Sequence, residues 1–227
     1  MQPTENITVS EIAAKSLAAV RVFERLGIDY CCGGKRPLTE VCRQKGYDAA
    51  AVRNELDEAE KATRDTTRDW NTAPLPELID HIVNTHHEYL KREMPALSTR
   101  LEKVYRVYNQ RYGETLPGLP EVYAGLRSEL EMHMRKEEMV MFPAIAAHKP
   151  FAAIDSPIAT LEAEHEIAGE ALAKIREITK DFHLPEYACV TYRALMSGLR
   201  ELEQDLHMHI HLENNVLFPR ALRLEAA

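Results

Sequence analysis

A motif that occurs twice constrains this chain most strongly. Residues 133–143 (HMRKEEMVMFP) and 209–219 (HIHLENNVLFP) share the pattern H-x3-E-x4-F-P. One histidine precedes each copy at a similar distance, since His87 lies 46 residues before the first copy and His165 lies 44 residues before the second. An internal duplication of this kind indicates that the second half of the segment repeats the structure of the first half.

The spacing within the motif suits a metal ion. Residues four apart lie on one face of an α-helix, about one turn from each other, so an imidazole and a carboxylate can reach the same ion. The pairs are His133 with Glu137 and His209 with Glu213. Core packing does not explain these polar residues, because a core requires apolar side chains at such positions. Two pairs and one histidine from each remaining helix give four nitrogens and two carboxylates, which predicts two iron ions.

Other histidines compete for the site. His207 and His211 are also four residues apart, but each is two residues from His209 and so is rotated by roughly 200° to the opposite helix face. We expect these two side chains to face solvent. His86 differs from His87 by only about 100° of rotation, and the spacing to the motif does not decide between them.

The rest of the chain is expected to be helical. Only 9 residues are Gly, and Ala, Leu and Glu are frequent, which favours helices over strands. Four long helices with short connections are expected at roughly 76–110, 119–148, 155–182 and 186–222. This pattern predicts an all-α fold with an antiparallel four-helix bundle.

A small helical domain is expected before the bundle. Thr8 and Glu11 form a capping box that opens a first helix, and Gly27 ends it. Two further helices are expected at roughly 37–46 and 48–62, and polar residues with prolines then indicate a linker. The predicted domains are residues 1–63, a linker over 64–76, and the bundle over 77–227.

Charge and hydropathy exclude several classes of protein. The formal net charge is −8, and no cluster of Lys and Arg is present, which argues against nucleic-acid binding. The sequence contains no apolar run long enough for a membrane span, and its first ten residues lack the features of an export signal. We therefore expect a cytoplasmic protein without membrane contact.

The four cysteines do not resemble a disulfide framework or a structural zinc site, because two are adjacent and none forms a CxxC pair. Cys42 and Cys189 are expected to be free thiols. Cys31 and Cys32 point in different directions and are candidate redox thiols, with Lys35 and the following helix favouring the thiolate. The alternative is a tight Gly-Gly turn in which both thiols only fill space.

With these residues in view, the chain resembles a known family. The pattern H…H-x3-E…H…H-x3-E resembles the hemerythrin-like domain. The segments DYCCGGK (29–35) and HIHLENNVLFPRA (209–221) together resemble the iron-sulfur cluster repair di-iron proteins of the RIC (ScdA/YtfE) type. The resemblance favours His87 over His86 and implies two iron ions, oxo- or hydroxo-bridged, held by His87, His133, Glu137, His165, His209 and Glu213.

The same resemblance implies a function. Members of the family restore iron-sulfur clusters damaged by nitric oxide or oxidants, so the expected partners are damaged iron-sulfur proteins, nitric oxide and oxygen, with a second copy of the chain as a candidate homodimer partner. The chain is expected to act primarily as a repair protein that donates iron, with nitric oxide reduction as a side activity. A nitric oxide reducing or scavenging enzyme, and a sensor of oxygen or nitric oxide, are the alternatives.

One position departs from oxygen-carrying hemerythrins. Those proteins have a fifth histidine one turn after the histidine of the third helix, a position that Gly169 occupies here. An open coordination position is therefore expected, which argues against reversible oxygen carriage. Glu138 and Glu164 are expected either to offset the positive charge of the metals or to be solvated.

Overall fold

The computed structural model describes residues 7–31, 33–62, 68–112, 116–147 and 151–223. They belong to two compact units, one formed by residues 1–78 with 207–227 and the other by residues 79–206. Every regular element within the described ranges is helical, which confirms the all-α prediction. None of the described helices is long and apolar enough to cross a bilayer.

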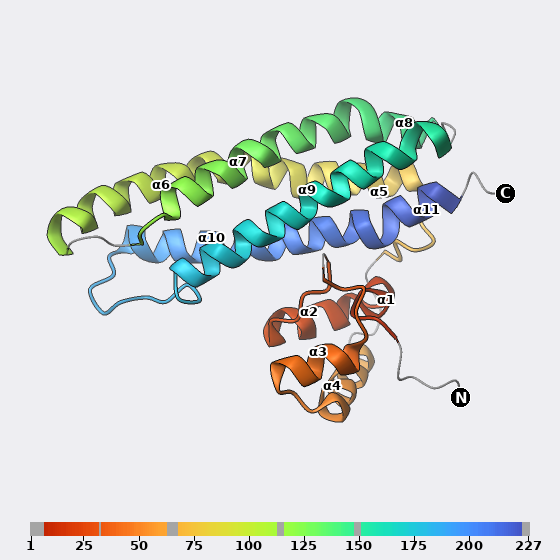
Figure 1. Ribbon diagram of the computed structural model, residues 1–227, viewed down its shortest axis with the longest axis horizontal. Coiled ribbons are helices and arrows are strands. Elements are labelled where there is room, and N and C mark those ends of the chain that lie inside the picture. The colour runs from red at the N-terminus through yellow and green to blue at the C-terminus, as the bar shows by residue number, and fades with distance from the viewer. Residues whose placement is uncertain (1–6, 32, 63–67, 113–115, 148–150, 224–227) are drawn as a thin grey trace. The chain divides into compact units, whose positions relative to one another are not determined.

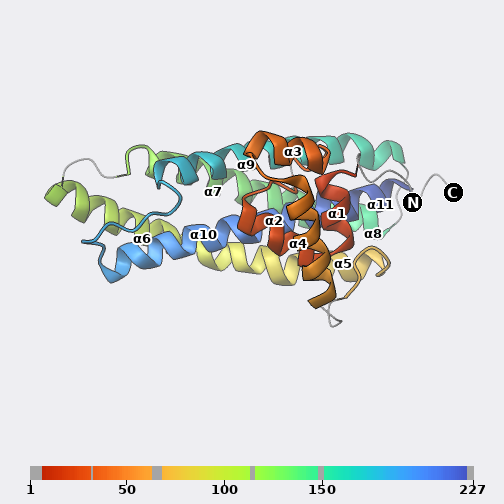
Figure 2. The same ribbon diagram turned by 90° about the horizontal axis from the view of Figure 1, so that it is seen from below.

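The unit of residues 79–206 is a helical bundle. Its helices run side by side in both views (Figures 1 and 2) and have these bounds: α5 (Leu75–His81), π-turn η2 (Ile82–His87), α6 (Glu88–Tyr112), α7 (Leu119–Lys136), π-turn η3 (Glu137–Met141), α8 (Phe142–Ala146), α9 (Phe151–Ile178) and α10 (Val190–His211). Leu97, Leu126, Leu172 and Leu199 come one from each long helix and are all buried in a shared core. Apolar residues at three- and four-residue spacing form this core, as amphipathic helices do.

Three π-turns interrupt helices that the sequence predicted to be continuous. They are η2, η3 and η4 (Leu212–Leu217), and in each the N–H that follows the turn donates to a carbonyl five residues back. The Phe-Pro of the motif gives a physical reason for two of them. Pro143 and Pro219 have no N–H to donate to the carbonyl four residues back, and their rings crowd it, so a wider turn relieves the clash.

The third long helix begins and ends about four residues earlier than predicted. It ends at Ile178 instead of about 182, because Lys180, Asp181 and Phe182 have positive φ angles of 51°, 58° and 57°. This left-handed backbone cannot continue a right-handed helix. The last long helix accordingly begins at Val190, a few residues later than predicted.

The N-terminal residues form four helices where the sequence predicted three. They are α1 (Val9–Lys15), α2 (Leu17–Leu26), α3 (Leu38–Lys45) and α4 (Ala49–Ala62), labelled in Figure 1. Ser16 is extended (φ −151°, ψ 112°), and its hydroxyl accepts the Ala19 N–H, so it ends one helix and caps the next. The capping box of Thr8 and Glu11 is confirmed, and so is the left-handed cap at Gly27.

The same unit includes the end of α10, η4 and α11 (Phe218–Arg223). Part of the predicted linker is fixed to it. The guanidinium of Arg220 donates to the carbonyls of Trp70 and Ala73 at 2.5 and 2.6 Å, and the Asn71 amide donates to the carbonyl of Ala14. Residues 70–73 are therefore held by hydrogen bonds to Arg220 of α11 and, through Asn71, to Ala14 of α1.

Candidate metal centre

The structure brings the six predicted ligand side chains together. All of them are buried, with at most 3% of any residue exposed. Their ligand atoms fall into two groups, within 4.8 Å of one another in each: His87, Glu137, His209 and Glu213 in one, and His133, Glu137, His165 and Glu213 in the other. Each group thus combines two different imidazoles with the same two carboxylates.

The two carboxylate oxygens of Glu137 lie near different histidines. Its Oε2 is 3.4 Å from Nε2 of His87, and its Oε1 is 3.2 Å from Nε2 of His133. Nε2 of His165 lies 2.9 Å from Nε2 of His133, so both rings aim the same ring atom at one small volume. A buried carboxylate and converging ring nitrogens form a donor set that fits a divalent or trivalent transition metal.

The second copy repeats this local geometry. Nε2 of His209 lies 3.0 Å from Oε1 of Glu213, one turn further along the chain. The π-turns begin at or next to the glutamates, since η3 starts at Glu137 and η4 starts at Leu212. π-turns within α-helices are often found at functional sites.

Two further carboxylates hold the ligand imidazoles from outside. Nδ1 of His87 is 2.8 Å from Glu138, and Nδ1 of His133 is 2.8 Å from Glu164. Glu138 also accepts from Lys91. Hydrogen bonds of this kind place the imidazole proton on Nδ1 and leave the Nε2 lone pair for a metal. The two glutamates therefore contact the centre and are not simply solvated.

The electrostatics keep these outer carboxylates ionised. Burial alone would raise the pKa of Glu138, but hydrogen bonds from Lys91 and His87 outweigh it and lower that pKa below its ordinary value. The pKa of Glu164 is lowered in the same way by Lys136 and His133. Each lysine supplies a positive charge that balances one acceptor carboxylate.

His86 lies outside both ligand groups. Its ring is buried, and Nδ1 is 2.9 Å from Oδ1 of Asp205, on α10. The structure therefore separates two adjacent histidines: His87 belongs to a ligand group, and His86 pairs with a carboxylate of the bundle. The assignment of the six residues as iron ligands stays a prediction.

The expectation that His207 and His211 face solvent is wrong. His211 is buried, and His207 is half-buried. The ring of His211 packs edge-on against Tyr30 at 5.5 Å between centroids. The amide of Asn215 donates to Nδ1 of His211 at 3.0 Å and to the carbonyl of Tyr30 at 3.3 Å. The outward face of this helix is thus covered by the N-terminal residues, a packing that a lone bundle would not provide.

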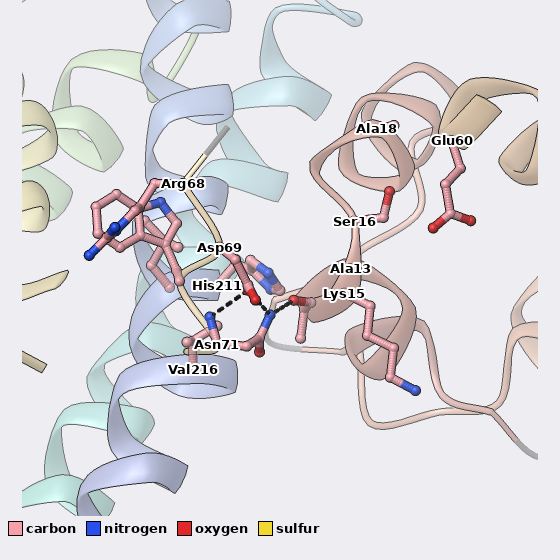
Figure 3. A pocket seen from close by; sticks show the side chains of 13 residues that line it. Ala13, Lys15, Ser16, Ala18, Glu60, Arg68, Asp69, Asn71, His211 and Val216 are labelled. Atoms are coloured by element: carbon pink, nitrogen blue, oxygen red, sulfur yellow. Dashed lines mark hydrogen bonds between the residues drawn. The ribbon is translucent and has the colours of Figure 1, made fainter. Parts of the chain in front are cut away.

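Burial also sets the charge of His211. Desolvation lowers the pKa of its imidazole to about 4, although the carbonyls of Ala13 and Tyr30 favour the protonated form. Since Asn215 donates to Nδ1, the neutral ring carries its proton on Nε2. His211 lines a cavity of about 260 Å³. Figure 3 shows it with other residues of the lining, among them Lys15, Asp69 and Asn71.

The turn that contains Cys31 is built by Asp29. Its carboxylate accepts the N–H of Cys31 at 2.9 Å and of Gly33 at 2.8 Å, and it accepts the Cys31 thiol at 3.3 Å. A Cβ on Gly34 would come within 2.5 Å of the Tyr30 carbonyl, so only glycine fits there. The redox role of Cys31 and Cys32 stays a prediction. Cys31 is buried, and Cys32 lies outside the described residues.

The two other cysteines differ from each other. Cys42 is buried, and burial raises the pKa of its thiol, as expected for a packed side chain. Cys189 is exposed, and a hydrogen bond with the Tyr108 hydroxyl lowers the pKa of its thiol. Both are free thiols, as predicted.

A pocket of about 200 Å³ between α7 and α9 reaches the ligand groups. It is lined by His133 and His165, which are buried, and by Met132, Lys136 and Ile167, which are exposed. Two of the six predicted ligand residues therefore lie in the wall of a pocket on one side of the bundle.

Comparison with known proteins extends these observations. Residues 78–221 match the family model of the hemerythrin HHE cation binding domain, and residues 5–60 match ScdA_N, a domain of unknown function. The chain is 40% identical over 215 residues to the iron-sulfur cluster repair protein YtfE of Citrobacter koseri, covering 94% of this chain and 96% of that protein. It is 39% identical, with the same coverage, to the proteins of that name from Escherichia coli O8 and Shigella boydii.

Proposed function

Since the chain belongs to the hemerythrin-like family of iron-sulfur cluster repair proteins, we propose that it repairs damaged iron-sulfur clusters by supplying iron from a non-haem di-iron centre. In this proposal residues 77–227 form the di-iron bundle and residues 1–63 form a separate domain. The substrates are iron-sulfur proteins damaged in the cytoplasm by nitric oxide or oxidants.

The sharing of Glu137 and Glu213 by both ligand groups is the observation that supports two irons. A single ion would use one group and leave a second pair of imidazoles buried without a role. Four neutral imidazoles and two carboxylates contribute a charge of about −2, so a diferric pair with an oxo bridge would keep a net charge of about +2. Iron bound there supplies Lewis acidity and one-electron redox chemistry, and an oxo or hydroxo bridge completes the proposed centre.

Residues around the centre hold the ligand His133 through contacts that we propose can be broken to release iron. Glu164 orients His133, and Lys136 pairs with Glu164 at a partly exposed position. In this proposal, movement of Lys136 or protonation of Glu164 would loosen the contact that orients His133. Iron that is donated as cargo is therefore proposed to leave on the side of His133 and His165, where the pocket opens.

Nitric oxide reduction at the same centre is the second candidate. Its support is Gly169, which is half-buried one turn beyond His165 and offers no side chain as a fifth ligand. An open position next to a redox metal can bind a small molecule. We propose it as a side activity of the repair protein.

Transfer of labelled iron tests the proposal. The protein is loaded with ⁵⁷Fe and mixed with a hydro-lyase whose four-iron cluster has lost one iron, and the Mössbauer spectrum and activity of the hydro-lyase are followed. We expect ⁵⁷Fe to enter the cluster as activity returns, and Glu213→Ala to abolish both. Recovery that proceeds equally well with the Glu213→Ala variant would overturn iron donation from this centre.

A further inference from the structure

The two copies of the motif carry the same residues at two outward positions. Met132 of the first copy corresponds to Met208 of the second, and Val140 corresponds to Val216, because each pair stands at the same distance from the motif histidine. These residues are not metal ligands. The duplication therefore has an outward face as well as a metal-binding face.

In the second copy the outward face is an interface. Met208 packs against the core of the N-terminal helices, and Val216 is only 2% exposed. His211 and Asn215 add polar contacts to Tyr30 on the same face. The chain's own N-terminal residues thus pack against this face.

In the first copy the equivalent face is uncovered. Met132, Met139 and Val140 are 55%, 77% and 61% exposed, and Ile167 of α9 is 49% exposed. Met132 lies one turn before the exposed Lys136 on α7, and Met139 and Val140 follow one turn later in η3. We call the four apolar side chains the α7 patch. Large apolar side chains gathered on a surface typically mark an interaction site.

The α7 patch continues into the pocket that reaches the ligands. Met132 and Ile167 line that pocket together with His133 and His165. A protein bound at the patch would therefore cover the pocket whose wall contains these two ligand residues. Iron that leaves through this pocket would enter the interface instead of bulk water.

We propose that the α7 patch is the docking surface for the iron-sulfur protein that receives the iron. This proposal rests on the proposed function, because it names the surface where the iron-accepting protein binds. Four side chains expose at most a few hundred Å², well below the roughly 800 Å² per partner of a stable interface. The patch thus fits a transient partner better than a stable second copy, and two flexible methionines adapt to partners of different shape.

The residues of the patch also argue against the N-terminal domain of another copy. In the second copy His211 and Asn215 contact Tyr30 of that domain. Their counterparts in the first copy are Arg135 and Met139. Neither counterpart reproduces the pair of side chains that meets the Tyr30 carbonyl. The acceptor should therefore offer an apolar surface beside its cluster.

The double variant Met139→Lys/Val140→Lys tests the proposal, because neither side chain lines the pocket. Both side chains are exposed, so folding and iron loading should be retained, and Val190→Lys, at an 83% exposed position on the start of α10, is the matched control. Two measurements are made on the di-iron protein: the rate of ⁵⁷Fe transfer to the three-iron hydro-lyase, and the rate of iron removal by a small chelator. We expect the double variant to slow protein transfer by about tenfold, as loss of an apolar anchor does, and to leave chelator removal within about twofold of the parent.

Each outcome decides the inference. Equal transfer rates for the double variant, the control and the parent would overturn the docking surface while leaving iron donation intact. Slowing of transfer and chelator removal by the same factor would also overturn it, because the substitutions would then act on the exit and not on the partner. A parent that sediments as a dimer, and a double variant that sediments as a monomer, would assign the patch to a second copy instead. If the parent itself transfers no iron, the proposed function fails first.

Discussion

The buried imidazole of His211 should make part of the stability of this protein depend on pH. Its pKa is about 4 in the folded protein, against an ordinary value of 6.5. A histidine whose folded pKa is depressed contributes fully above pH 6.5, and its contribution is lost as the pH falls from 6.5 towards 4. The reason is structural, because protonation at Nδ1 would set a second donor against the amide of Asn215.

The magnitude follows from the gap between the two pKa values. At about 1.4 kcal/mol per pKa unit, the gap corresponds to about 3 kcal/mol in total and to about 1.4 kcal/mol at pH 5.5. His211→Gln removes the titrating group while retaining an amide that can donate to the Tyr30 carbonyl. The variant is less stable at pH 7.5, but its free energy of unfolding should fall less steeply between pH 7.5 and 5.5.

Denaturant unfolding of the iron-loaded protein at the two pH values provides the assay. The carboxylates and the ligand histidines are present in both proteins, so their titration cancels in the difference between parent and variant. His183→Gln, at an exposed position, controls for the loss of a histidine. Parallel pH profiles for the parent and His211→Gln would refute the argument that this ring is buried in its neutral form by the N-terminal residues.

Three further variants test other parts of the proposal. Glu164→Gln should lower metal affinity by about tenfold, as loss of a carboxylate behind a ligand imidazole does, measured by competition with a chelator; unchanged affinity would show that Glu164 is only solvated. Replacing Cys31 and Cys32 by Ser should leave iron content unchanged and weaken cluster repair, whereas full repair would make both thiols space-filling. Gly169→His should slow iron release and reaction with nitric oxide in stopped-flow experiments, and an unchanged rate with both irons retained would mean that the open position lies elsewhere.

Much of the fold, and the placing of the candidate ligands on shared helix faces, could be predicted because both depend on the spacing of residues within a few helical turns. His133 and Glu137 stand four residues apart, a spacing that puts them on one helix face in any α-helix. The helix caps at Thr8 and Gly27 were equally local, since a capping box and a left-handed glycine act within one turn. Such features depend little on the rest of the molecule.

The errors arose where distant segments meet. His211 was placed in solvent because the helix pattern alone does not reveal that Tyr30 covers it. Ser16 could be recognised as a helix cap, but the break it causes depends on its extended backbone. The π-turns had one local signal, the Pro that follows Phe in the motif, which removes a donor at a fixed distance after Glu137 and Glu213.

The metal content of the purified protein tests the central claim most directly. Metal analysis with Mössbauer spectroscopy on ⁵⁷Fe-grown protein should give about two irons per chain in a non-haem centre, since the ligand groups accommodate two ions and share Glu137 and Glu213. His87→Ala should lose iron, and His86→Ala should retain it. One zinc per chain with no iron, or equal iron loss from both variants, would contradict the di-iron account.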